Sequence, residues 1–326
     1  MDLPSRSQIE AAADIVHRAI PPTPQIVWPL LGHALGAEAW VKHENHVPVG
    51  AFKVRGGLVY FDRLLSREPA CRGVISATRG NHGQSIGFSA RAAEVPATIF
   101  VPLGNSREKN DAMRALGVSL VEHGRDFQEA REEAARVAKE QSLHFVPSFH
   151  FDLVAGVATA YHELFRAAPD LDVVLVPIGL GSGFAACVAA REALGCRARI
   201  LGVVSAQAPC YALSRRAGKP VEAEVTTAIA DGLACRVPDA EALDLLQRYA
   251  EDVLEVTDSE IAEAMRILFR TTHNVAEGAG AASLAGALQI KSRLAGKKVG
   301  VILTGGNVDS DVFARVLSGS GNFHGR

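Results

Sequence analysis

The side chain that best suits covalent chemistry in this sequence is the amine of Lys53, within the stretch Gly50–Gly57. Lys53 lies behind Phe52 and small residues, after a run at 38–42 that predicts a strand, where a helix is expected to begin. Partial burial and the positive end of a helix both disfavour the ammonium ion and lower the pKa of a lysine. Such a lysine can act as a Schiff-base nucleophile. Taken alone, the stretch is more often an ordinary helix start.

Three glycine-rich loops give this lysine a chemical context. In the loop at 76–84, the backbone N–H groups of a helix start suit a carboxylate, and Asn81 can bind a phenolic ring oxygen. In the loop at 176–184, glycines let backbone amides approach a phosphate, and the Ser182 hydroxyl adds a donor. The third loop, at 303–308, places the Thr304 hydroxyl at a strand end, where it can reach a pyridine nitrogen. Each loop alone also fits a plain turn.

The loop at 176–184 has a rival interpretation as a dinucleotide-binding turn. Its third glycine is Gly183, and Phe184 occupies the position where the G-x-G-x-x-G pattern needs glycine. The next predicted strand ends in Val204-Ser205, without the acid expected for a ribose. The pattern therefore favours a single phosphate over NAD. Glu277, which precedes another predicted helix, is by itself most simply an acid that complements the helix dipole.

The elements that must position these residues alternate between strand and helix. Apolar runs predict strands at 73–76, 97–101, 118–121 and 143–146, with helices between them, so a small parallel α/β unit is expected. A second series follows, with strands predicted at 172–176, 198–204 and 298–303 and helices at 184–194, 261–271 and 280–294. Thr257 and Glu260 form a capping-box pattern before one of them. The predicted fold is α/β with two parallel or mixed sheets and one cleft between them.

Composition excludes several classes of protein. The chain has 326 residues, 48% of them hydrophobic, and a net charge of -2 from 34 basic and 36 acidic residues. The basic residues are not clustered as they would be for a nucleic-acid partner. No apolar run is long enough to span a membrane. The five cysteines are scattered and never form a C-x-x-C pair, and the N-terminus lacks the layout of a secretory signal, so a cytoplasmic location is expected.

Together, the Lys53 stretch, the three loops and Glu277 resemble the serine/threonine dehydratase branch of the fold-type II pyridoxal phosphate (PLP) enzymes, over about residues 20–310. The resemblance implies a large PLP-binding domain at 1–55 and 147–326, with a small domain inserted at 56–146. It also implies a homodimer or higher homo-oligomer. The chain leaves little room for the regulatory extension of biosynthetic threonine deaminases, so a catabolic or specialised role is expected.

The resemblance also assigns roles to individual residues. Lys53, beside Phe52, would hold PLP as a Schiff base, and Asn81 would touch the ring oxygen. Thr304 would face the ring nitrogen, and Glu277 would lie near the ring. The phosphate would be bound by Gly179, Leu180, Gly181, Ser182 and Gly183. The substrate carboxylate would be surrounded by Thr78, Arg79, Gly80, Asn81 and His82.

Two departures from the family narrow the expected function. Arg79 replaces the serine that acts as a second base in racemases, and an arginine is a poor base at neutral pH. The segment Ser205–Pro209 lacks the carboxylates with which many relatives bind a divalent cation, so no metal is expected.

The predicted activity is a PLP-dependent dehydratase, or ammonia-lyase, for a small-molecule substrate: a β-hydroxy-α-amino acid such as L-threonine or L-serine. Bulkier substrates such as phenylserine or 3-hydroxyaspartate remain open. One alternative is a β-replacement synthase of the cysteine-synthase kind. Two further alternatives, outside PLP chemistry, are an NAD-dependent oxidoreductase and a non-catalytic ligand-binding domain.

Overall fold

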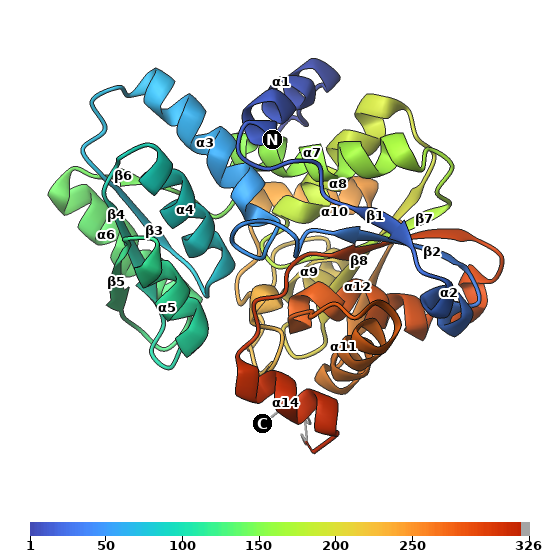
Figure 1. Ribbon diagram of the computed structural model, residues 1–326. Coiled ribbons are helices and arrows are strands. Elements are labelled where there is room, and N and C mark those ends of the chain that lie inside the picture. The colour runs from blue at the N-terminus through green and yellow to red at the C-terminus, as the bar shows by residue number, and fades with distance from the viewer. Residues whose placement is uncertain (321–326) are drawn as a thin grey trace.

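The larger of two β-sheets has six strands in the order β1-β2-β10-β7-β8-β9. Figure 1 labels β1, β2, β7 and β8 of this sheet. The structure is a computed structural model that describes residues 1–320. Strand β1 runs antiparallel to β2, and the other neighbours are parallel. The strands are β1 (Gln25–Val27), β2 (Glu38–His43), β7 (Val173–Pro177), β8 (Arg199–Ser205), β9 (Asp252–Val256) and β10 (Lys298–Leu303).

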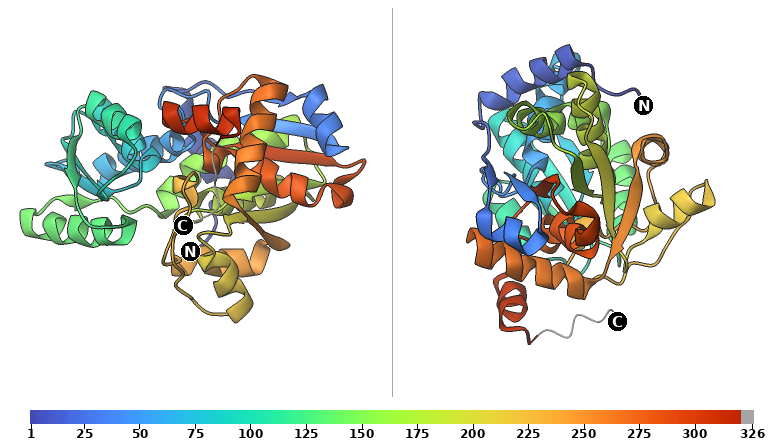
Figure 2. Two further views of the ribbon diagram at one scale, coloured as in Figure 1. Left: turned by 90° about the horizontal axis from the view of Figure 1, so that it is seen from below. Right: turned by 90° about the vertical axis from the view of Figure 1, so that its right-hand side faces the viewer.

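The smaller sheet has four parallel strands in the order β5-β4-β3-β6. Figure 2 shows this sheet and its helices standing to one side of the larger sheet. Its strands are β3 (Val74–Ala77), β4 (Ala97–Val101), β5 (Ser119–Glu122) and β6 (His144–Phe145). The predicted fold class, α/β with two parallel or mixed sheets, is therefore confirmed. The predicted domain boundaries at residues 56 and 146 stay a prediction.

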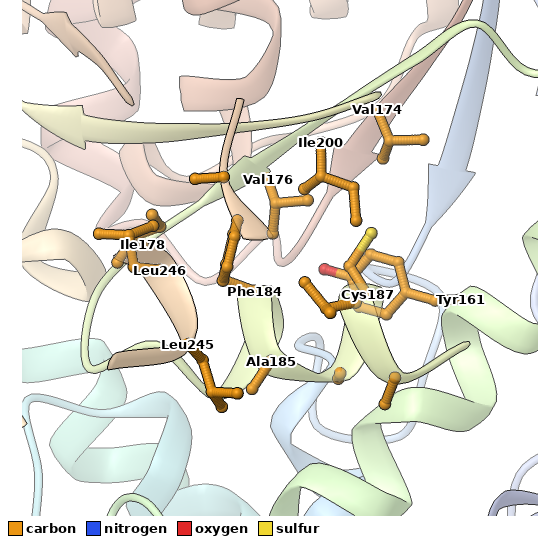
Figure 3. Packing of buried hydrophobic residues seen from close by; sticks show 14 of the residues in the cluster. Tyr161, Val174, Val176, Ile178, Phe184, Ala185, Cys187, Ile200, Leu245 and Leu246 are labelled. Atoms are coloured by element: carbon orange, nitrogen blue, oxygen red, sulfur yellow. The ribbon is translucent and has the colours of Figure 1, made fainter. Parts of the chain in front are cut away.

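Side chains alternate between the two faces of the larger sheet, and helices bury both faces. On β7, Val174 and Val176 join the core formed with α1, α7, α8, α9 and α10, whereas Val173 and Leu175 join the core formed with α2, α11 and α12. Figure 3 shows Phe184 at the start of α8 beside Val176. A strand buried on both faces reads as a continuous apolar run, which is why the sequence predicted β7 well.

Helices also cover both faces of the smaller sheet. One face packs against α3, α4 and α5, and the other packs against α6. The helices of the chain are α1 (Arg6–His17), α2 (Pro29–Leu35), α3 (Lys53–Arg67), α4 (Asn81–Ala92), α5 (Arg107–Ala115), α6 (Phe127–Gln141), α7 (Phe151–Ala167), α8 (Ser182–Leu194), α9 (Cys210–Ala217), α10 (Ala240–Tyr249), α11 (Asp258–Thr272), α12 (Gly278–Gln289), α13 (Lys291–Leu294) and α14 (Ser310–Ser318), with a 3-10 turn η1 (Asp231–Leu233).

The structure corrects some predicted elements. The single helix predicted at 280–294 is two helices, because the backbone of Ile290 (φ -109°, ψ 19°) leaves the helical region between α12 and α13. The elements β1, α2, β9, α9, α10 and α14 were not predicted from the sequence. The capping box of Thr257 and Glu260 is present at the start of α11. Within residues 1–320, every helix is too short or too polar to cross a membrane.

Candidate functional site

One cleft collects all the residues that the sequence singled out as site residues. The cleft is open to solvent on one side, and its empty space, including that open part, is about 830 Å³. The predicted residues that line it are Phe52, Lys53, Thr78, Arg79, Gly80, Asn81, His82, Gly179, Leu180, Gly181, Ser182, Gly183, Glu277 and Thr304. All of them except Glu277, which lies between α11 and α12, come from segments that follow strands of the two sheets, so the cleft depends on how the two sheets pack.

Lys53 is the first residue of α3, as the sequence predicted. Burial lowers the pKa of Lys53 to about 8, although the negative charge of Glu277 opposes this shift. The Lys53 Nζ donates a hydrogen bond to the Ser182 Oγ at 3.3 Å. A lysine with this pKa is partly neutral near physiological pH, so its amine can act as a nucleophile or accept a proton.

A buried ion network fixes the helix that carries Lys53. Arg55, two residues after Lys53 on α3, is fully buried and donates to the Glu44 carboxylate at 2.8 Å and 3.0 Å. The same guanidinium donates to the Glu163 carboxylate on α7 at 2.7 Å and 3.0 Å. The Ser85 hydroxyl on α4 donates to the Lys53 carbonyl at 2.7 Å. These bonds join α3, α4 and α7 at the point where Lys53 enters the cleft.

The loop before α8 fits a phosphate. Helix α8 begins at Ser182, and its N-cap, Gly181, offers no side-chain hydrogen bond, so the first backbone N–H groups are free to bind an anion. Gly181 has φ +97°, which strongly favours glycine. A Cβ at Gly179 would lie only 2.3 Å from the Gly232 carbonyl oxygen. Glycine at positions 179 and 181 therefore keeps two of the residues before α8 free of side chains, which suits the phosphate of PLP.

The loop after β10 lies directly against the Lys53 stretch. The Thr304 carbonyl accepts a hydrogen bond from the Phe52 N–H at 3.0 Å, and Thr304 is almost fully buried. Asn307, which the sequence did not single out, donates from its Nδ2 to the Asn81 Oδ1 at 3.0 Å and to the Val49 carbonyl at 2.8 Å. Asn307 thus orients the amide of Asn81, the residue predicted to touch the cofactor ring.

Glu277 is not used as a helix cap. It precedes α12 and makes no side-chain capping bond; instead its carboxylate accepts from the Asn81 Nδ2 at 2.5 Å and from the Lys109 Nζ at 2.8 Å. Lys109 also donates to Asp231 at 2.7 Å. Burial alone would lower the pKa of Lys109, but the two carboxylates outweigh it and raise that pKa overall.

Sequence analysis missed Lys109 and Asp231, although both line the cleft. Lys109 could have been found from its position in the helix that follows β4, because ligand sites lie at the carboxyl ends of parallel strands. Asp231 lies in a 3-10 turn within a stretch that showed no periodic pattern.

The loop between β3 and α4 forms the opposite wall. The Thr78 Oγ1 accepts hydrogen bonds from the N–H groups of Gly80 (2.9 Å) and Gly83 (3.2 Å), which leaves its hydroxyl hydrogen able to donate to a ligand. Burial lowers the pKa of His82 to about 3, with a further contribution from the charge of Lys53, so His82 is neutral. The N-cap of α4, Gly80, has no side chain that could cap the helix, so the N–H groups of its first two residues, Asn81 and His82, suit a carboxylate.

Comparison with known proteins identifies this arrangement. A family profile described as "Pyridoxal-phosphate dependent enzyme" matches residues 16–305. The chain belongs to this PLP-dependent family. It is 32% identical over 292 residues to an L-threonine ammonia-lyase from Thermotoga maritima, covering 89% of this chain and 72% of that protein. It is 33% identical over 321 residues to an L-threo-3-hydroxyaspartate ammonia-lyase from Saccharomyces cerevisiae, covering 98% of both.

A solved structure supports the same assignment. The processed form of threonine deaminase isoform 2 from Solanum lycopersicum superimposes with a TM-score of 0.88 at 25% identity, covering 98% of this chain and 96% of that one. The family, the cofactor and the fold-type II class predicted from the sequence are confirmed, and the protein is a PLP-dependent lyase. The interpretations as an NAD-dependent oxidoreductase or a non-catalytic domain are set aside. The roles of individual residues stay predictions.

Proposed function

We propose that this PLP-dependent enzyme is an ammonia-lyase that converts a β-hydroxy-α-amino acid to a 2-oxo acid and ammonia. The observation that carries the proposal is the meeting of Lys53, whose pKa is lowered to about 8, with the uncapped start of α8 at Ser182. An amine that can react with an aldehyde therefore lies beside an anion site in one cleft. The relatives from Thermotoga maritima and Saccharomyces cerevisiae, both ammonia-lyases by name, support the same reaction class.

The overall reaction balances without an oxidant. The bond from Cα to hydrogen and the bond from Cβ to the hydroxyl break, so one water molecule leaves. The resulting enamine becomes an imine, and water then adds to it and releases ammonia. PLP, when bound, supplies an electron sink for the charge that develops at Cα. Every other task falls to side chains and backbone N–H groups of this protein.

Lys53 would hold PLP and later carry the proton removed from Cα on its Nζ, which a pKa of about 8 allows near neutral pH. The Thr304 hydroxyl, a neutral partner, would face the ring nitrogen, and Asn81, oriented by Asn307, would bind the ring oxygen. The start of α4 and the Thr78 hydroxyl would bind the α-carboxylate. The neutral His82 beside them would add a hydrogen-bonding group without a charge.

A β-replacement synthase fits the residues around Lys53 less well than an ammonia-lyase does. Such enzymes usually carry Asn-Thr-Lys-Asp around the lysine, whereas this chain has Ala51-Phe52-Lys53-Val54. Formation of cysteine from O-acetylserine and sulfide, faster than release of any 2-oxo acid, would favour that alternative. The homo-oligomeric state and the cytoplasmic location expected from the sequence belong to this proposal as well.

The test is a substrate panel with the purified enzyme and PLP. An absorbance band at ~410 nm that borohydride removes is expected for PLP linked to a lysine. We expect release of a 2-oxo acid from at least one of L-serine, L-threonine, phenylserine and L-threo-3-hydroxyaspartate. Lys53→Ala should abolish this release, while Lys291→Ala, which changes an exposed lysine on α13, should not. Substantial turnover by Lys53→Ala, or none by the wild type on the whole panel, would refute the proposal.

A further inference from the structure

Arg79 is a charged side chain of the cleft that the reaction described above does not use. It follows β3 and precedes α4, and it lines the same cleft as Lys53 and Ser182. Its Nε is buried and has no hydrogen-bond partner within residues 1–320. The carboxylates that line the cleft, Asp231 and Glu277, are paired with Lys109 instead. Arg79 as a whole is half-buried, and its Nε is the atom that is buried without a partner. An unpaired buried donor is costly, so the placement of this Nε favours a role in binding a ligand over a role in the fold.

The other charged groups of the cleft are already accounted for. Lys109 lies between the carboxylates of Asp231 and Glu277, at 2.7 Å and 2.8 Å. His82 is neutral because burial lowers its pKa. Lys53 is the lysine that would be linked to PLP. Arg79 therefore leaves one positive charge in the cleft wall that has no counter-ion in residues 1–320.

The cofactor and the α-carboxylate have anion sites of their own. The uncapped start of α8 suits the phosphate, and the uncapped start of α4, with the Thr78 hydroxyl, suits the α-carboxylate. Neither anion needs the fork of an arginine. A guanidinium binds a carboxylate through two parallel hydrogen bonds, which is the geometry that a second carboxylate on the substrate would use.

We propose that Arg79 binds a carboxylate on the side chain of the substrate, so that the preferred substrate is a β-hydroxy-α-amino dicarboxylic acid. This inference rests on the proposed function and narrows its substrate class. With such a substrate the enzyme eliminates water between Cα and Cβ, and hydrolysis of the imine releases ammonia and a 2-oxo dicarboxylic acid. A serine or threonine side chain would leave the guanidinium of Arg79 without a partner, which disfavours these substrates.

The test compares selectivity rather than activity. The value of kcat/KM is measured for L-threo-3-hydroxyaspartate and for L-serine in the wild type, in Arg79→Gln and in Arg79→Lys. We expect the wild type to prefer the dicarboxylic substrate, and Arg79→Gln to lower the ratio of the two values on the order of 100-fold. Arg79→Lys should fall between them, because it keeps the charge and loses the fork. The ratio does not depend on the fraction of enzyme that is folded or loaded with PLP.

The matched control is Arg107→Gln, which removes the same charge from an exposed arginine at the start of α5, outside the cleft, and should leave the ratio unchanged. Inhibition of serine turnover gives a second measurement. Succinate should inhibit the wild type more strongly than butyrate, which has the same carbon count and one carboxylate, and Arg79→Gln should remove this difference.

The outcomes separate the two proposals. A wild-type ratio near one, or an Arg79→Gln variant with the wild-type ratio, would overturn the role of Arg79 while leaving the ammonia-lyase activity in place. Equal losses for both substrates in Arg79→Gln would show that Arg79 binds the α-carboxylate or supports the fold, which also overturns the inference. If the wild type releases no 2-oxo acid from either substrate or from the wider panel, the proposed function itself fails.

Discussion

Replacement of Lys109 by methionine is expected to destabilise the protein strongly, and more at high pH than at low pH. The Lys109 Nζ joins Asp231 and Glu277 at 2.7 Å and 2.8 Å, and the residues Lys109 and Glu277 are only 4% and 2% exposed. Lys109 belongs to α5 beside the smaller sheet, and Glu277 precedes α12 beside the larger one. The pair therefore ties the two halves of the cleft together.

The magnitude follows from what remains after the change. Methionine keeps most of the aliphatic stem, so the main loss is the charge that compensates two carboxylates. Breaking a buried ion pair by removing one partner costs about 3–5 kcal/mol. Asp231 keeps some contact with solvent, which limits the penalty, so we expect a loss of about 3 kcal/mol in the free energy of unfolding at pH 8.

The pH dependence follows from Glu277. Burial raises its pKa, and the charge of Lys109 opposes that rise. Without Lys109 the folded-state pKa of Glu277 moves further above the unfolded value of about 4.3. A group with a raised folded-state pKa favours folding when protonated, and this contribution is lost as the pH rises through the folded-state pKa. The deficit of Lys109→Met should therefore be smaller at pH 5.5 than at pH 8.

The assay is urea denaturation of the PLP-free protein at both pH values, followed by circular dichroism. The set comprises the wild type, Lys109→Met, Glu277→Gln and the double variant. We expect the double variant to be more stable at pH 8 than Lys109→Met by about 1 kcal/mol or more, because one uncompensated charge is gone. A Lys109→Met variant within about 0.5 kcal/mol of the wild type at pH 8, or with the same deficit at both pH values, would refute the reasoning.

Two further predictions concern the cofactor and metal ions. Only a neutral amine attacks an aldehyde, so the rate at which the PLP-free protein captures PLP should rise with pH and level off above about 8, the pKa to which burial lowers Lys53. A rate that keeps rising to pH 10, as for an ordinary lysine, would contradict that pKa. Because Ser205–Pro209 carries no carboxylate, turnover should be unchanged after treatment with EDTA. A large loss that Mg²⁺ or Ca²⁺ restores would show that ligands come from elsewhere.

The sequence by itself determined the local parts of this protein. Lys53 at the start of α3, the glycine loop before α8 and the capping box at Thr257 are all encoded within a few residues of chain. Apolar runs buried on both faces made strands such as β7 and β10 recognisable. For this reason the strands and helices of the two sheets, and the loops that line the cleft, could be predicted from the sequence.

Only the tertiary structure decided which charges face one another. Lys109 and Glu277 are 168 residues apart, and Asn307 and Asn81 are 226 apart, so neither pairing leaves a local pattern. Glu277 looked like an acid at a helix start, yet packing of the two sheets turns it toward Lys109 and Asn81. Arg79 likewise has a buried Nε without a hydrogen-bond partner in residues 1–320, because the segments that face it across the cleft place no acceptor within reach of that atom. Ion pairs in a cleft are set by the relative placement of distant loops, because charge interactions depend on distance in space and not along the chain.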